Sequence, residues 1–141
     1  MDVEEFTKIF RKKGLKLTTQ RLEIFKSIIS RNDHPTTEKI YKSLKYKYPT
    51  ISLGTVYKTL HLFKELGLIQ ELNFSEDTIR YDPNTDFHIN MICSKCGKII
   101  DYNNDKVKAI WETILSDLKF KPKGQRIDIY YDCEDCEKKE D

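Results

Sequence analysis

The sequence predicts an α+β protein in two parts, a basic helical part followed by a β-hairpin and a smaller part with strands and one helix. Three observations carry this prediction. Apolar residues recur at helical spacing up to Leu66, alternation typical of strands begins after Gly67, and four cysteines form two Cys-x-x-Cys pairs in the second part. The 141 residues suffice for one ordinary domain or two small ones.

The first two helices are predicted by apolar spacing and by their end signals. Apolar residues from Val3 to Phe10 recur at helical spacing, and Gly14 ends that segment. Thr18 or Thr19 can cap a second helix, whose apolar stripe continues to residue 29.

The third and fourth helices lie close together in the sequence. Thr36 or Thr37 starts the third helix, Pro49 stops it, and Ser52 can cap a fourth that runs to Leu66. Two helices joined by a short turn predict a helix-turn-helix.

Strand patterns follow at residues 68–72 and 78–81 and flank a turn from Asn73 to Asp77. Helices followed by a hairpin predict a winged helix, with the fourth helix as its DNA reader. The residues expected on the exposed face of that helix are Ser52, Thr55, Tyr57, Lys58 and His61.

The charge distribution favours a polyanionic partner. Residues 6–64 carry 14 Lys or Arg and 3 acidic residues, a net charge of +11, whereas residues 83–141 carry 10 basic and 12 acidic residues, a net of −2. A charge run is often only a solvated face. An excess of this size nevertheless suits DNA, because each cation near a phosphate releases condensed counterions.

The second part has the pattern of a small α/β domain. Strands are predicted at 88–93, 98–102 and 127–131, with an amphipathic helix over 105–118. One helix covers only one face of such a sheet, so we expect the other face or the edge to meet a second copy of the chain. The predicted boundaries are 1–82 for the winged helix, 83–87 for a hinge and 88–141 for the dimerisation domain.

The cysteines predict a structural zinc site. Cys93 and Cys96 form one Cys-x-x-Cys pair, Cys133 and Cys136 form the other, and 36 residues separate the pairs. Four thiolates complete a tetrahedral site that favours zinc and leaves no position open for a substrate. Two disulfides are the alternative, and a thioredoxin-like redox motif would need only one such pair.

The N-terminus has no apolar core like that of a signal peptide, and no apolar run approaches the roughly 20 residues that span a bilayer. We therefore expect a cytoplasmic protein with no membrane association.

Four segments resemble the ferric-uptake-regulator (Fur) family, in the right order and over nearly the whole chain. They are GLKLTTQR at 14–21, HPT at 34–36, SLGTVYKTL at 52–60 and CSKCGK at 93–98. Within the family the match most resembles PerR, the peroxide-sensing branch. The resemblance implies a dimeric, metal-dependent repressor, not an enzyme, that binds palindromic operator DNA.

The resemblance also implies a set of functional residues. The regulatory metal, Fe(II) or Mn(II), is expected on His34, Asp82, His88, Asn90 and Asp101. The DNA-binding residues are expected to be Lys16, Arg21, Ser52, Thr55, Tyr57 and Lys58.

Two features depart from the family pattern. Asn90 stands where a histidine is usual, and Phe87, Ile89 and Gln125 stand where the ligands of a further metal site are expected. Asp82 matches the peroxide-sensing branch, since iron sensors tend to have glutamate at that position.

The mechanism that the resemblance implies begins when the regulatory metal holds both winged helices on DNA. Peroxide then oxidises a histidine ligand, the metal leaves and the DNA is released, while the zinc-bound cysteines take no part. The alternatives are an iron- or zinc-uptake regulator of the same family, a winged-helix and zinc-ribbon factor associated with RNA polymerase, and a thiol oxidoreductase. The long helix at 105–118 argues against a zinc ribbon, whose spacers are shorter.

Overall fold

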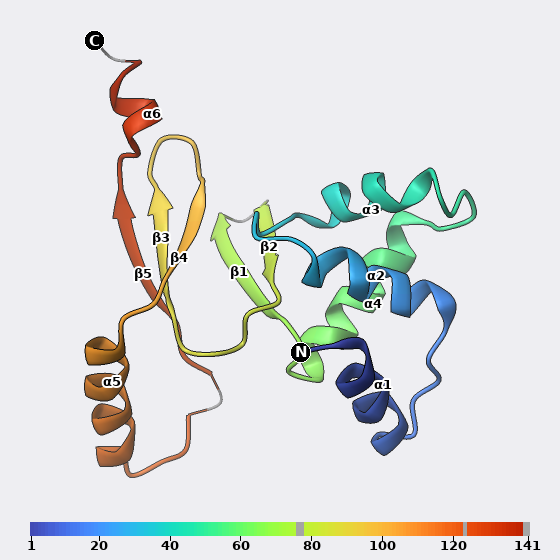
Figure 1. Cartoon of the computed structure of the whole chain (residues 1–141), viewed down its shortest axis with the longest axis horizontal. Helices are drawn as coiled ribbons and strands as arrows, with labels where there is room; N and C mark the ends of the chain where they lie inside the picture. The colour runs from blue at the N-terminus through green and yellow to red at the C-terminus, as the bar shows by residue number, and fades with distance from the viewer. Residues whose placement is uncertain (76–77, 123, 140–141) are drawn as a thin grey trace. The chain divides into compact units, whose positions relative to one another are not determined.

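The computed structural model describes residues 1–75, 78–122 and 124–139, and these divide into two units, Met1–Thr85 and Asp86–Asp141 (Figure 1). The first unit holds four helices and a hairpin, and the second holds a three-stranded sheet and two helices. None of the helices within these ranges has the length and apolar character needed to cross a membrane.

Side-chain caps set the starts of the helices in the first unit. These helices are α1 (Val3–Lys12), α2 (Thr19–Ile29), α3 (Thr37–Lys45) and α4 (Leu53–Glu65). Thr18, Thr36 and Ser52 each accept a hydrogen bond from a backbone N–H in the first turn of α2, α3 and α4 respectively. At the other end of α4, Gly67 has φ +70°, the left-handed conformation in which helices commonly end.

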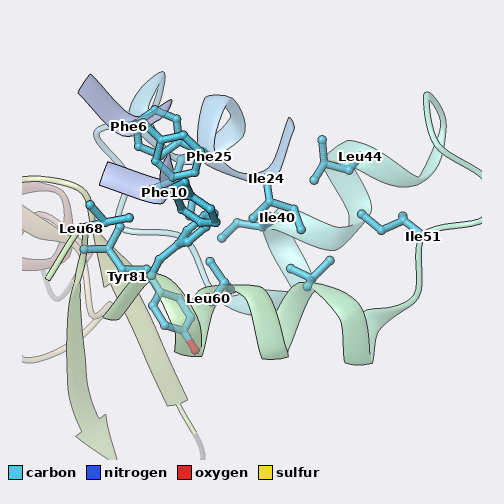
Figure 2. Close-up of a cluster of buried hydrophobic side chains, with 14 residues drawn as sticks. Phe6, Phe10, Ile24, Phe25, Ile40, Leu44, Ile51, Leu60, Leu68 and Tyr81 are labelled. Atoms are coloured by element: carbon cyan, nitrogen blue, oxygen red, sulfur yellow. The ribbon is translucent and has the colours of Figure 1, made fainter. Parts of the chain in front are cut away.

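An aromatic cluster forms the centre of the first unit (Figure 2). The rings of Phe6 and Phe25 stack with centroids 3.9 Å apart, and Phe63 of α4 meets Phe6 edge-on at 5.3 Å. These three side chains have no exposed surface. The cluster therefore joins α1, α2 and α4, which fixes the direction in which α4 presents its outer face.

The hairpin of the first unit is attached to the helix-turn-helix by its second strand. Strands β1 (Gln70–Ser75) and β2 (Thr78–Asp82) pair antiparallel. Tyr81 donates its backbone N–H to the carbonyl of Pro35 at 3.0 Å, and Thr36 forms a β-bridge with Arg80. The predicted winged helix-turn-helix is confirmed; residues 76 and 77 of the predicted turn lie outside the described residues.

In the second unit, β3 (Ile89–Cys93) is the central strand. It pairs antiparallel with β4 (Ile99–Tyr102) and parallel with β5 (Ile127–Tyr131), which gives the order β4-β3-β5. Helix α5 (Asp105–Asp117) begins at Asn104, whose side chain accepts two backbone hydrogen bonds, and α6 (Glu134–Glu137) follows β5. The predicted α+β fold is confirmed.

The packing of α5 differs from the prediction that this helix covers a face of the sheet. Figure 1 shows α5 beyond the end of the strands, and none of its residues is buried. Ile110 is 62% exposed and Ile114 is 44% exposed. Only two residues, Asn103 and Asn104, separate β4 from α5, so the helix starts just past the end of β4, and its apolar stripe stays open in a single chain.

Replacing Phe63 by alanine should destabilise the protein by about 3–5 kcal/mol, because the change leaves a cavity where three rings meet. The matched control is Tyr46→Ala, since Tyr46 is 96% exposed and should contribute less than about 0.5 kcal/mol. Urea unfolding followed by circular dichroism measures both changes. Equal losses in the two variants would contradict this assignment of the core.

Candidate metal centres and nucleic-acid interface

The four cysteines converge at one end of the sheet. Cys93 ends β3, Cys96 lies in the turn that Gly97 closes with φ +69°, and Cys133 and Cys136 lie at and within α6. All four sulfurs lie within 4.8 Å of one another and none is in a disulfide, so the disulfide alternative does not fit. The Sγ atoms of Cys96 and Cys133 are 3.8 Å apart, close to the edge of about 3.8 Å of a tetrahedron with Zn–S bonds of about 2.3 Å.

The electrostatics of this cluster also suit a cation. Backbone N–H groups of Cys96 and Cys133 point at the sulfur of Cys93 and lower the pKa of its thiol to about 6. The pKa of Cys136 is raised to about 12, chiefly by its hydrogen bond with the Cys133 sulfur and by burial. Four adjacent thiolates repel one another, and a divalent cation relieves that repulsion. The cluster therefore fits the zinc predicted for it.

In the first unit, His34 and Asp82 lie together. Nε2 of His34 is 3.5 Å from Oδ2 of Asp82, and both residues are buried. The other carboxylate oxygen of Asp82, Oδ1, accepts the backbone N–H of Asn84 at 2.8 Å, which fixes the carboxylate. The two residues meet because Pro35 and Thr36, next to His34, pair with the strand that ends at Asp82.

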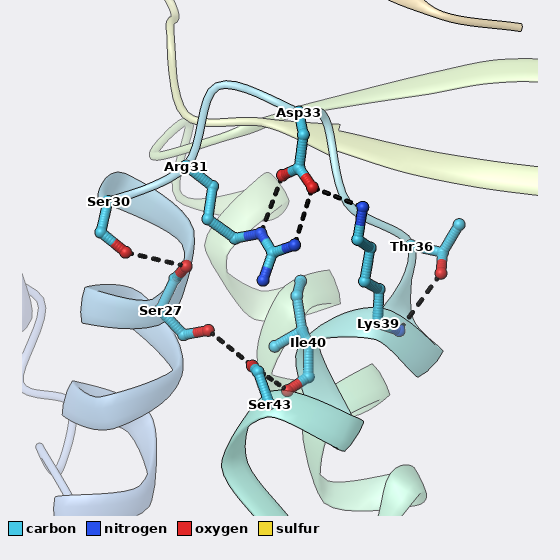
Figure 3. Close-up of polar contacts among 8 residues, drawn as sticks. All are labelled: Ser27, Ser30, Arg31, Asp33, Thr36, Lys39, Ile40 and Ser43. Atoms are coloured by element: carbon cyan, nitrogen blue, oxygen red, sulfur yellow. Dashed lines mark hydrogen bonds and ion pairs between the residues drawn. The ribbon is translucent and has the colours of Figure 1, made fainter.

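Charged side chains hold the loop that carries His34 (Figure 3). Arg31 donates two hydrogen bonds to Asp33, at 2.8 and 2.7 Å, and the Lys39 ammonium lies 2.5 Å from the same carboxylate. The hydrogen bonds from Arg31 lower the pKa of Asp33 far below its usual range. This support matters because His34 has φ +44°, a left-handed conformation that few non-glycine residues adopt.

In the second unit, His88, Asn90 and Asp101 form a second polar set. Nε2 of His88 is 3.2 Å from Oδ1 of Asn90 and 3.8 Å from Oδ1 of Asp101. The strand register explains the grouping, because Asn90 pairs directly with Asp101 across β3 and β4. His88 precedes Asn90 by two residues, which places both on the same face of the sheet.

The hydrogen bond of the other His88 nitrogen defines its tautomer. Nδ1 is 2.8 Å from the backbone carbonyl of Asp86, and a carbonyl can only accept, so Nδ1 carries a proton. When the imidazole is neutral, this tautomer places the lone pair of Nε2 toward the oxygens of Asn90 and Asp101. Three electron-pair donors that face one another are stabilised by a cation, and such nitrogen and oxygen donors without a thiolate suit Fe(II), Mn(II) or Zn(II).

The neighbours of Asn90 on the third strand, β5, could not be predicted from the sequence pattern. Asn90 also pairs in register with Asp128 of β5, and its Nδ2 donates to Oδ1 of Asp128 at 2.9 Å. Arg126 lies 2.7 Å from the other oxygen of that carboxylate. The alternation of Arg126 and Asp128 with apolar residues was visible, but the parallel pairing that brings them to Asn90 is a tertiary feature.

The residues at the expected positions of a further metal site have other contacts. The ring of Phe87 lies against Trp111 of α5, with centroids 6.1 Å apart. The indole N–H of Trp111 donates to the side-chain oxygen of Gln125 at 2.5 Å. These contacts tie α5 to the segments that precede β3 and β5.

Helix α4 presents the residues that were predicted to bind DNA. Tyr57 is 52% exposed and Lys58 is also exposed, whereas Val56 and Leu60 have no exposed surface. Ser52 has a local structural role, because its hydroxyl accepts the backbone N–H of Thr55 at 3.0 Å and lies 2.9 Å from the Thr55 hydroxyl.

A basic pocket adjoins this face of α4, with a volume of about 330 Å³. It is lined by Lys16, Thr18, Gln20, Arg21, Thr55, Lys58 and Thr59. Arg21 donates to the backbone carbonyl of Lys16 at 2.5 Å, and its guanidinium lies 5.9 Å from the centre of the Phe10 ring. Three cations and several hydroxyls at one concave surface suit a phosphate group.

Comparisons with known proteins agree with this arrangement. The sequence profile of the Ferric uptake regulator family matches residues 12–130. The peroxide-responsive repressor PerR of Staphylococcus epidermidis is 36% identical over 135 residues, which cover 96% of this chain and 90% of the relative.

Two solved structures are also similar. A structure of GAS PerR with zinc (PerR-Zn-Zn) has 32% identity and a TM-score of 0.55, with 95% of this chain and 86% of that chain covered. The ferric uptake regulator of Pseudomonas aeruginosa with manganese has 25% identity and a TM-score of 0.78, with 94% of this chain and 99% of that chain covered. The chain belongs to the ferric uptake regulator family.

Proposed function

We propose that this chain is a metal-dependent, DNA-binding transcriptional repressor that senses peroxide through oxidation of a histidine ligand. The observation that carries the proposal is the convergence of Nε2 of His88 with the side-chain oxygens of Asn90 and Asp101. The peroxide response is inferred from the Staphylococcus epidermidis relative, a peroxide-responsive repressor of nearly the same length.

Zinc on Cys93, Cys96, Cys133 and Cys136 is the permanent metal of this proposal. It links the β3–β4 turn to the segment after β5, and so holds together a unit whose helices bury little apolar surface. Zinc-bound thiolates that fill all four positions leave no site for substrate, so the cysteines act as structural ligands.

The regulatory ion of the proposal is bound by His34 and Asp82 from the first unit and by His88, Asn90 and Asp101 from the second. The two donors of the first set and the three of the second together can fill five of the six positions of the octahedral geometry that iron or manganese commonly adopts. When bound, Fe(II) would reduce peroxide and cleave its O–O bond, so that one peroxide oxygen could add to a nearby imidazole while the other leaves as water, whereas Mn(II) would support repression without that reaction. Joint binding restrains residues 83–87, which act as the hinge.

The DNA-binding surface of the proposal combines base reading with phosphate contacts. Tyr57 packs on thymine methyl groups in the major groove, Lys58 contacts phosphate or a guanine edge, and Lys16 and Arg21 contact the backbone. Thr55 and Ser52 keep the start of α4 in place at the groove. The protein acts in the cytoplasm as a homodimer, which the open apolar stripe of α5 supports, and it binds a palindromic operator.

Coupling between metal and DNA follows from this arrangement. An ion bound by side chains from both units restrains the hinge of each chain. In a dimer, this restraint limits the angle between the two DNA-reading helices, one α4 from each chain. Such couplings are typically about 1–3 kcal/mol, enough to change operator occupancy about 5- to 150-fold. Loss of one histidine ligand removes the restriction and releases the operator.

A metal-level regulator of the same family is the second candidate. Asn90 favours it, because a neutral amide oxygen is a weaker donor than imidazole and raises the metal concentration at which the site fills, so that occupancy can follow the metal level. The similarity to a manganese-containing ferric uptake regulator also fits this function.

Replacing Cys93 by serine should remove zinc and the dimer together, since three sulfurs cannot complete the tetrahedral site. Elemental analysis and size-exclusion chromatography with light scattering measure the two properties. The matched control is Ser94→Ala, because Ser94 uses only its backbone N–H, which donates to Tyr131. A zinc-free dimer in the Cys93→Ser variant would contradict the structural role proposed for zinc.

Tyr57→Ala should reduce sequence preference by about 1–3 kcal/mol, whereas Lys16→Ala should weaken binding to all sequences alike. The measurement is fluorescence anisotropy with an operator selected from random duplexes and with a scrambled duplex, over a range of KCl concentrations. Lys16→Ala should also lower the salt slope by about 0.9. Lys138→Ala, which removes one exposed cation from the second unit, is the control and should leave both affinities unchanged. An unchanged ratio of specific to non-specific affinity for Tyr57→Ala would reject α4 as the base reader.

Peroxide should add one oxygen atom to His34 or His88 in the Fe(II)-loaded protein and not in the Mn(II)-loaded protein. Peptide mass spectrometry detects the addition, and anisotropy follows release of DNA in the same samples. His61 is the internal control, because it is the third of the three histidines and lies outside both ligand sets. Release of DNA without any histidine change would favour the metal-level regulator.

A further inference from the structure

Asp128 is the partly buried partner of Asn90, the one ligand residue that departs from the family pattern. It lies on β5 in register with Asn90, and its side chain is 13% exposed. Oδ1 of Asp128 accepts the amide N–H of Asn90 at 2.9 Å, and Oδ2 lies 2.7 Å from Arg126. Both carboxylate oxygens are therefore engaged, one by the amide and one by the guanidinium.

This contact decides which end of the Asn90 amide faces the other ligands. An ionised carboxylate can only accept hydrogen bonds, so it selects the amide nitrogen and turns the oxygen the opposite way. Oδ1 of Asn90 then lies 3.2 Å from Nε2 of His88, on the side of Asp101. Without the carboxylate, the amide could present its N–H₂ group, which repels a cation.

We infer that Asp128 is a positioning residue for the regulatory metal. It accepts the N–H of the Asn90 amide and thereby keeps the amide oxygen, Oδ1 of Asn90, directed toward the ion. This inference rests on the proposed function. The charge-assisted hydrogen bond also draws electron density toward the amide oxygen, which makes this neutral group a better donor. Arg126 pairs with Asp128, so its positive charge is balanced beside a cation site.

Two other roles for Asp128 are distinguishable from this one. Asp128 could itself bind the ion, or its hydrogen bond could only strengthen the pairing of β3 with β5. In either case Asp128 would act independently of the Asn90 side chain. A positioning role requires that the effect of Asp128 disappear once Asn90 has no amide.

The experiment is a double-mutant cycle with the zinc-loaded chain of 141 residues. Free Mn(II) is measured by electron paramagnetic resonance during titration of the unmodified protein, Asp128→Ala, Asn90→Ala and the double variant. Zinc content and circular dichroism report whether each variant is folded. Asp117→Ala is the charge-matched control, since Asp117 is an exposed carboxylate at the end of α5. Asp128→Asn adds a variant of the same shape that can still accept a hydrogen bond.

Asp128→Ala should weaken Mn(II) binding by about 10- to 100-fold, the range typical of groups that orient metal ligands. Asp128→Asn should weaken it less, and Asp117→Ala should not change it. In the Asn90→Ala background, Asp128→Ala should add less than about a twofold effect.

Two results would overturn the inference alone: unchanged Mn(II) binding in Asp128→Ala, or the same loss in both backgrounds. Failure of the proposed function looks different. In that case the unmodified protein binds no Mn(II) beyond its zinc, or binds it without any change in DNA affinity.

Discussion

The hydrogen bond from the backbone of Tyr81 to the carbonyl of Pro35 organises the first unit. It joins the second strand of the wing to the loop before α3, and the neighbouring bridge between Thr36 and Arg80 extends the pairing. Because the strand ends at Asp82 and His34 directly precedes Pro35 in the loop, the pairing that builds the winged helix also brings two proposed ligands within 3.5 Å. Sheet formation and metal binding therefore depend on the same backbone contact.

In the second unit, strand pairing likewise brings polar side chains from three strands next to one another. The central strand β3 pairs on one side with β4 and on the other with β5, so Asp101, Asn90 and Asp128 lie next to one another across the sheet. Cys93, the last residue of the same strand, belongs to the cysteine cluster. One five-residue strand thus supports both proposed metal centres, which explains why the small unit needs little apolar core beyond the residues that flank it.

The features that local chemistry determines were predictable from the sequence. Thr18, Thr36, Ser52 and Asn104 mark helix starts because their side chains satisfy backbone donors that no other group reaches. The cysteine cluster was equally predictable, since two Cys-x-x-Cys pairs leave disulfides or a redox motif as the alternatives to a metal site. The position of α5 could not be predicted from the sequence. An amphipathic pattern identifies the apolar face of a helix and leaves open whether a sheet or a second chain covers that face.

The role of Asn90 depends on a tertiary contact as well as on its identity in the sequence. Its identity is visible in the sequence and indicates a weaker ligand than the histidine that is usual there. Its chemistry depends on a carboxylate 38 residues away, which only the parallel pairing of β3 and β5 brings into contact. A neutral amide whose orientation is fixed by a partly buried carboxylate can remain a ligand, because folding has already lost the conformational entropy of ordering that amide. Asparagine at position 90 therefore weakens the proposed site and keeps the number of its donors.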